Sequence, residues 1–171
     1  MNSHRDLCVI VGCWFLEQSN ISLIGWEFKY NRGFIDVLGL SLSDRGIQKI
    51  CVAEVKRTRA DLLQDLKKHK LLKYEYGSTH CYLAATAEAL RLDKQTEKQA
   101  VEELHKLGLP KTWGVLVIEH QVRSIHSAQQ INKPNALRIR GLIKKVARSN
   151  MWRALQANGI REPIPDTEEE Y

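Results

Sequence analysis

The chain has 171 residues, 43% of them hydrophobic, which suffices for one sizeable core and is too little for two comfortable domains. No apolar run approaches the length of a membrane span, so we expect no membrane association and predict a cytoplasmic, intracellular protein, for which nucleoid association or a phage origin are both open. The formal charge is +6, but residues 1–161 carry all 26 Lys and Arg and only 15 of the 20 acids, a net +11. A body this basic favours nucleic acid as the partner.

The four cysteines lie in apolar surroundings without a CxxC pair. This favours buried free thiols over a zinc ribbon or a disulfide framework. The six histidines are scattered, and none has the HExxH spacing or another spacing that places two imidazoles on one metal. We therefore expect ordinary surface or core histidines.

The first predicted element is a largely buried helix over residues 6–18, where apolar residues are dense. Three runs rich in β-branched and aromatic residues follow, and the turn residues between them predict an antiparallel meander. The runs span residues 23–30, 33–40 and 48–55. Thr58 then opens a helix to about residue 76, because Thr58 and Asp61 match a capping box and leucines recur at helical spacing.

The remaining elements are shorter. A strand is predicted at 79–84, a charged helix at 94–107, strands at 113–119 and 121–127, and a last helix at 136–157. The order α-β-β-β-α-β followed by additions implies an α/β (α+β) fold, in which helices flank a mixed sheet rather than an all-parallel one.

An acid, Asp36, interrupts the apolar second strand, where an unpaired carboxylate is costly. The third strand ends in Glu54-Val55-Lys56, and alternation points Glu54 and Lys56 to the same face. If the strands are neighbours, Asp36 joins them. Two carboxylates and a backbone carbonyl, here that of Val55, suit Mg²⁺ or Mn²⁺. Such an ion supports phosphodiester hydrolysis, with Lys56 orienting the attacking water or stabilising developing charge.

Two alternatives stay open for these acids. Asp36, Glu54 and Lys56 can form a plain salt bridge at the edge of the sheet, because an acid followed later by ExK is a common pattern. Glu27, on the first strand, can reach the metal directly or through water, or it can face solvent.

The runs 35–37 (Ile-Asp-Val) and 53–56 (Ala-Glu-Val-Lys) resemble the PD-(D/E)xK nuclease core, which has the same α-β-β-β-α-β order, although no proline precedes Asp36. With Glu27, the segment 54–65 is more closely similar to the MmcB-like DNA-repair branch. The resemblance covers about residues 23–88 and stops before residue 110.

This resemblance implies a restriction-endonuclease-like core and metal-dependent hydrolysis that leaves a 5′-phosphate. It assigns Asp36 and Glu54 as metal ligands and Lys56 as the catalytic lysine. A further acid from the first helix completes some sites of this superfamily, which makes Asp6 and Glu17 candidates here.

We expect the chain to divide into three parts. Residues 1–110 are the predicted nuclease core. Residues 111–161 add strands and a basic helix within the same compact domain, and residues 162–171 form an acidic tail that we expect to be disordered.

Nucleic-acid contacts are expected from two basic groups. Arg57 and Arg59 lie within three residues after Lys56. The last helix adds an exposed basic side, and its apolar side should dock on the body. The basic residues are Arg138, Lys144, Lys145 and Arg148, and the apolar ones are Ile139, Leu142, Ile143 and Val146.

Together these features predict a Mg²⁺-dependent DNA endonuclease of repair, recombination or phage DNA metabolism, structure-selective or weakly sequence-selective. Whether RNA is also cut stays open. The alternatives are a sequence-specific restriction or homing-type endonuclease, with residues 110–160 as the recognition addition, and a non-catalytic nucleic-acid-binding module. Cutting both strands favours a homodimer, whereas nicking needs only a monomer.

Overall fold

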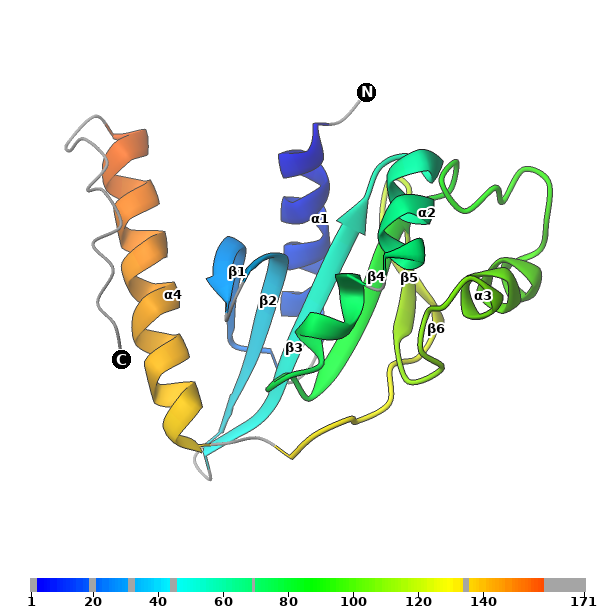
Figure 1. Cartoon of the computed structure of the whole chain (residues 1–171). Helices are drawn as coiled ribbons and strands as arrows, with labels where there is room; N and C mark the ends of the chain where they lie inside the picture. Colours follow the sequence, from blue (N-terminus) through cyan, green and yellow to red (C-terminus); the bar gives the residue numbers. More distant parts are fainter. Residues whose placement is uncertain are drawn as a thin grey trace.

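The structure is a computed structural model that describes residues 3–18, 21–30, 33–43, 46–68, 70–133 and 136–158 (Figure 1). The predicted acidic tail, residues 162–171, lies outside them. The elements in chain order are α1 (His4–Glu17), β1 (Leu23–Tyr30), β2 (Gly33–Ser43), β3 (Gly46–Lys56), α2 (Arg59–Lys67), the 3₁₀ helix η1 (Lys70–Tyr74), β4 (His80–Thr86), α3 (Glu97–Lys106), β5 (Gly114–Ile118), β6 (Val122–His126) and α4 (Ala136–Ala157).

The six strands form one mixed sheet in the order β1-β2-β3-β4-β5-β6. Strands β1, β2 and β3 are antiparallel neighbours, so the predicted meander is confirmed. Strand β4 lies parallel to both β3 and β5, and β6 returns antiparallel along β5. The prediction of a mixed sheet flanked by helices is therefore confirmed.

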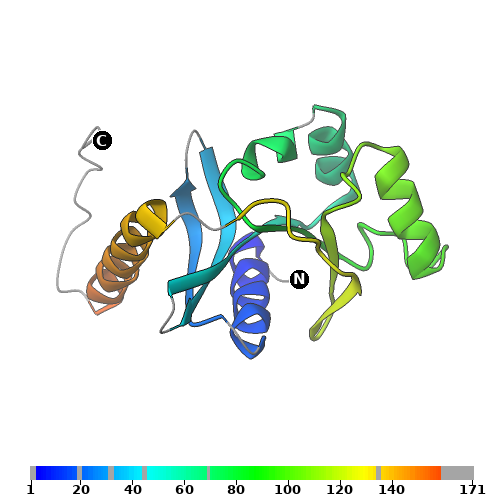
Figure 2. The ribbon, with the colours of Figure 1, turned by 90° about the horizontal axis from the view of Figure 1, so that it is seen from below.

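Helices cover both faces of the sheet (Figure 2). Helix α1 packs on one face through Leu7, Cys8, Val11 and Phe15. On the other face lie α2, η1 and α3, whose buried residues share one core with β2, β3 and β4. The prediction of a largely buried α1 was too strong, because Val9 is 40% exposed, as befits a helix that packs on a sheet through one side only.

The predicted helix over 58–76 was wrong in its length. Thr58 does cap a helix, accepting a hydrogen bond from the Asp61 N–H, but α2 ends at Lys67 and η1 follows. If the helix continued without a break, residues 69, 70 and 73 would lie on the same face as Leu62 and Leu66. Among the described side chains of η1, Leu71 and Tyr74 are buried and Lys73 is exposed, so the break turns Leu71 and Tyr74 onto the sheet.

Helix α4 stands beside β1, where Figures 1 and 2 both place it at one edge of the sheet. Its predicted apolar side is confirmed at Leu142 and Val146, which are buried in the same core as α2. The Asn150 side chain donates a hydrogen bond to the Ile24 carbonyl at 3.0 Å, which ties α4 to β1. Among the described residues, no helix combines the length and the apolar character that crossing a membrane requires.

Candidate active site

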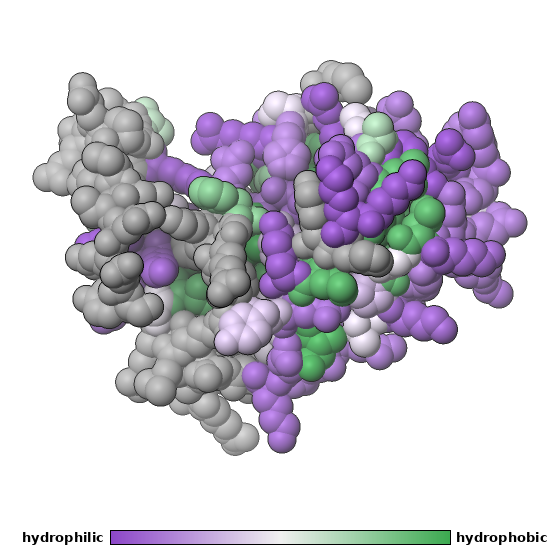
Figure 3. Space-filling model, viewed as in Figure 1, coloured by the Kyte–Doolittle hydropathy of each residue, from purple (hydrophilic) through white to green (hydrophobic). Residues whose placement is uncertain are grey.

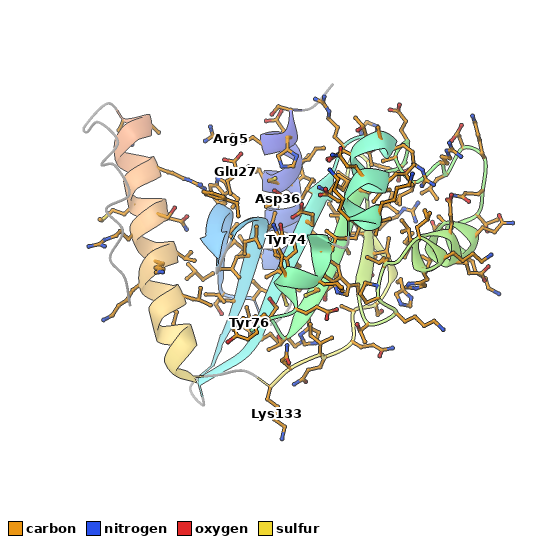
Figure 4. All side chains as sticks on the ribbon, in the orientation of Figure 1. Arg5, Glu27, Asp36, Tyr74, Tyr76 and Lys133 are labelled. Atoms are coloured by element: carbon orange, nitrogen blue, oxygen red, sulfur yellow. The ribbon has the colours of Figure 1, made fainter. Side chains whose placement is uncertain are left out.

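Three acids lie in a row across neighbouring strands. The ladder places Trp26 opposite Val37 and Phe28 opposite Ile35, which leaves Glu27 facing Asp36. The next ladder begins at Val37 and Ala53, so Asp36 and Glu54 lie just beyond its end, where the charge of Asp36 acts on Glu54. We call Glu27, Asp36 and Glu54 the acidic row. The sheet thus brings together the three acids that the sequence singled out, and Figure 4 shows Glu27 and Asp36 on adjacent strands.

Glu54 is the most constrained member of the acidic row. It is only 8% exposed, and its Oε2 is buried without a hydrogen-bond partner among the described residues. Tyr74 lies close by and favours the charged form, but its hydroxyl donates its hydrogen bond to the Phe34 carbonyl at 2.8 Å. Burial, and then the negative charge of Asp36, raise the pKa of Glu54 above its ordinary value. A buried carboxylate oxygen with no donor is a costly group.

Lys56 points to the same side of β3 as Glu54, as alternation predicted. Its Nζ donates hydrogen bonds to Glu54 Oε1 at 2.9 Å and to Asp65 Oδ2 at 2.6 Å. Asp61 Oδ2 is 3.6 Å away. Although burial opposes the charged form, these carboxylates raise the pKa of Lys56 above its ordinary value. Lys56 therefore stays protonated near neutral pH, which suits an electrostatic role and not that of a general base.

Asp36 is held between β3 and α1. Its Oδ2 accepts a hydrogen bond from the Val55 N–H at 2.7 Å, which fixes the carboxylate at the end of β3. Its Oδ1 lies 3.3 Å from His4 Nε2 at the start of α1. Of the alternative, a salt bridge among Asp36, Glu54 and Lys56, the Lys56–Glu54 pair is present, but among the described residues Lys56 otherwise pairs with Asp61 and Asp65 and not with Asp36.

The charge of the acidic row converges on one buried thiol. Burial first, and then the charges of Asp36, Glu27 and Glu54, raise the pKa of Cys8 to about 12. Cys8 is fully buried, as predicted, whereas the prediction was wrong for Cys13, which is exposed on the outer side of the helix.

Glu27 has an unusual backbone. Its φ of 47° is in the left-handed region, which is uncommon for a residue with a side chain. Its carbonyl accepts a hydrogen bond from Arg153 of α4 at 3.3 Å, and the Arg153 guanidinium also lies over the Trp26 ring, 5.3 Å from its centroid. Strained positions of this kind concentrate at functional sites.

The other acids considered for the site lie elsewhere. Asp6 belongs to the cap of α1: its Oδ2 accepts a hydrogen bond from the Ser3 N–H at 2.8 Å. Glu17 is the last residue of α1, at the opposite end of the helix from His4. The structure brings neither carboxylate to the acidic row.

The basic residues predicted to contact nucleic acid differ in whether their side chains are exposed. Arg57 is exposed. Arg59 is half-buried, and its guanidinium is bound by Glu103 and by the Ala89 carbonyl, so it has a structural partner already. On α4, Lys144, Lys145 and Arg148 are exposed, while the Arg138 side chain lies outside the described part of the chain.

Four residues that surround the predicted site were not assigned to it from the sequence: His4, Cys8, Tyr74 and Asp65, although Asp65 ends the segment 54–65 that carries the resemblance. The i, i+4 spacing of His4 and Cys8 on one helix face was a usable signal. Asp65 and Tyr74 reach the site only because α2 and η1 dock on the sheet. No local pattern reveals that docking.

The donors around Asp36 and Glu54 are of the kind that hold a hard divalent cation such as Mg²⁺ or Mn²⁺. The unpartnered Glu54 Oε2 and the repulsion between the two carboxylates would both be relieved by such an ion. The oxygen-rich chemistry of the row therefore fits the ion that the sequence implied.

Comparisons with known proteins give a fold likeness only. No protein-family model and no curated protein matches the chain. Among solved structures, the chain is similar to the SPO1766 protein of unknown function from Silicibacter pomeroyi, with 26% identity and a TM-score of 0.55. The match covers 85% of this chain and 84% of that one, so the likeness extends over most of both.

Proposed function

We propose that this protein is a metal-dependent DNA endonuclease with a core of the PD-(D/E)xK type. The element order α1-β1-β2-β3-α2, followed by β4, is the order of that core. Asp36 lies on β2, and Glu54 and Lys56 end β3 directly before α2, which are the positions that the resemblance requires.

The observation that carries the proposal is the buried, unpartnered Oε2 of Glu54 beside Asp36. Here Lys56 donates to Oε1, and no described residue donates a hydrogen bond to Oε2, so that oxygen can accept a cation. A decayed nuclease site would not be expected to keep so costly a group.

The chain's own residues then have distinct roles. Asp36 and Glu54, with the Val55 carbonyl, would hold the ion, and the ion would supply an activated water and charge neutralisation at the phosphate. Lys56, anchored by Asp65 and kept protonated, stabilises the negative charge that develops on the scissile phosphate. Glu27 lies at the open end of the acidic row and is exposed, so it would act through water.

The DNA would be held by charge next to this site. Helix α4 reaches Glu27 through Arg153, so its exposed cations Lys144, Lys145 and Arg148 lie on an element that borders the acidic row. Contacts of this kind neutralise phosphates without reading bases. This favours structure-selective or weakly sequence-selective cutting over the restriction or homing class.

The test is a cleavage assay on supercoiled plasmid, single-stranded DNA, branched DNA and RNA with Mg²⁺, Mn²⁺ or EDTA. Wild type is compared with Asp36→Asn and, as a matched control, with Asp93→Asn, which changes an exposed acid between β4 and α3. We expect cutting that requires the divalent ion, is lost in Asp36→Asn and is kept in Asp93→Asn.

Each other outcome selects against the proposal. Cutting that persists in EDTA or in Asp36→Asn contradicts the mechanism. DNA binding without cleavage of any substrate would leave the binding-module alternative. Cleavage confined to one long recognition sequence would favour the restriction or homing class.

A further inference from the structure

A second group of side chains with metal-ligating atoms shares Asp36 with the acidic row. His4 and Cys8 sit one turn apart on the same face of α1, and Asp36 of β2 lies opposite them. Their ligand atoms, His4 Nε2, Cys8 Sγ and a carboxylate oxygen of Asp36, all lie within 4.8 Å of one another. One imidazole, one thiol and one carboxylate are thus gathered in a single place.

Two of the three separations between ligand atoms match a tetrahedral ion, and the third is within 4.8 Å. His4 Nε2 lies 3.3 Å from Asp36 Oδ1 and 3.5 Å from Cys8 Sγ. Bonds of about 2.0–2.3 Å to a tetrahedral Zn²⁺ separate its N, O and S ligands by about 3.4–3.6 Å. Octahedral Mg²⁺, with bonds of about 2.1 Å, separates adjacent ligands by only about 3.0 Å. The two measured separations therefore suit a four-coordinate ion better than a six-coordinate one.

The donor types point the same way. A thiolate with an imidazole selects Zn²⁺ and related ions, while Mg²⁺ prefers oxygen ligands alone. The Cys8 sulfur is fully buried, whereas the His4 side chain is 44% exposed and the Asp36 side chain 18%, so an ion can enter from the His4 side. Both helical ligands stand on a capped, regular helix, which holds them rigidly.

We propose that His4, Cys8 and Asp36 bind a thiophilic first-row metal ion of the Zn²⁺ class. On binding, the Cys8 thiol releases its proton to solvent and the thiolate becomes a ligand, with water as the fourth ligand. Because Asp36 also belongs to the oxygen-rich site, the thiophilic ion removes a ligand from Mg²⁺ and inhibits cleavage. That competition rests on the proposed function, while the binding itself does not.

The experiment is a titration of EDTA-treated, dialysed protein with Co²⁺, which stands in for Zn²⁺ and has absorption bands. We expect a near-ultraviolet band from a cobalt–thiolate bond that saturates at one equivalent and disappears when Zn²⁺ is added. The band should be lost in Cys8→Ser and kept in Cys13→Ser, a matched control that removes an exposed thiol from the same helix.

His4→Gln keeps the test decisive if Cys8→Ser does not fold, because His4 is largely exposed. Since the loss of outer-shell partners alone costs about 10–100-fold in metal affinity, we expect His4→Gln to weaken Co²⁺ binding at least about tenfold. Absence of the thiolate band in wild type, its retention in folded Cys8→Ser, or unchanged affinity in His4→Gln would overturn the proposal.

Glu54→Gln separates this site from the proposed nuclease site. Glu54 is not one of the three ligands, so the variant should keep the cobalt–thiolate band while losing Mg²⁺-dependent cleavage. A band in a protein that cuts no substrate would support the metal site and contradict only the nuclease. Equal inhibition by Zn²⁺ of wild type and Cys8→Ser would overturn the competition at Asp36.

Discussion

At the scale of single residues, Glu54 is the side chain of the site whose burial costs the most free energy. One oxygen is bound by Lys56 and the other has no partner among the described residues, while Asp36 repels the same carboxylate. Natural proteins keep such groups where a ligand satisfies them. The cost of Glu54 in the metal-free protein should therefore be measurable as an effect of pH on stability.

Glu54 should make the metal-free protein less stable as pH rises. Its pKa in the folded state is raised above the ordinary value of 4.5, so the folded state binds more protons than the unfolded state between those two pKa values. The free energy of unfolding then falls as pH rises from about 4.5 through the folded pKa, and the loss persists above it. Urea unfolding in EDTA across this range should show a smaller fall for Glu54→Gln than for wild type.

The exposed acid Asp93 supplies the control for this measurement. Asp93→Asn should keep the wild-type fall, since its carboxylate is solvated in both states. A Glu54→Gln profile parallel to that of wild type would show that Glu54 is not the group responsible.

Lys56 should contribute strongly to stability. It is 5% exposed and its ammonium group is bound by Glu54 and Asp65, both of which are also buried. Lys56→Met leaves these carboxylates without their cation, and breaking a buried pair from one side costs about 3–5 kcal/mol. Urea unfolding should show this loss of unfolding free energy in Lys56→Met. The control Lys67→Met alters an exposed lysine of α2 and should lose almost none. A loss below about 1 kcal/mol would contradict the buried network.

At the scale of elements, α4 has one side that docks on the body and another that is exposed. Leu142 and Val146 attach it to the core, and Asn150 and Arg153 donate hydrogen bonds to carbonyls of β1. Its other side stays exposed and basic. In Figure 3, the hydrophilic surface over α2 and α3 lies at the opposite end of the molecule from this helix.

Neutralising the exposed cations of α4 should weaken DNA binding and its dependence on salt. Each phosphate contact contributes about 0.9 to the slope of log affinity against log salt, so the triple variant Lys144→Gln, Lys145→Gln, Arg148→Gln should lower that slope by about 0.9 per lost contact. Fluorescence anisotropy with duplex DNA at several salt concentrations measures both quantities.

Arg123 provides the matched control on β6. Its guanidinium is already bound by Glu97 and by Glu119, so Arg123→Gln should leave the salt slope unchanged. If the triple variant binds with wild-type affinity and slope, α4 is not the DNA-binding element.

At the scale of the whole molecule, the sequence predicted what depends on local periodicity. The meander β1-β2-β3 follows from alternation and turn residues, and the same alternation placed Glu54 and Lys56 on one face. The break between α2 and η1 was not predictable, because it depends on where Leu71 and Tyr74 meet the sheet. For the same reason the contacts of Asp36 with His4, and of Lys56 with Asp65, appear only in the folded chain.

The most direct measurement is the single-turnover rate at which wild type and Glu54→Gln nick supercoiled plasmid in Mg²⁺, with DNA binding measured in parallel. Losing even an outer-shell partner of a metal costs about 10–100-fold, so loss of a ligand should slow nicking at least about a hundredfold while DNA binding is retained. Nicking by Glu54→Gln at the wild-type rate, or wild type that binds DNA and cuts none, would contradict the account.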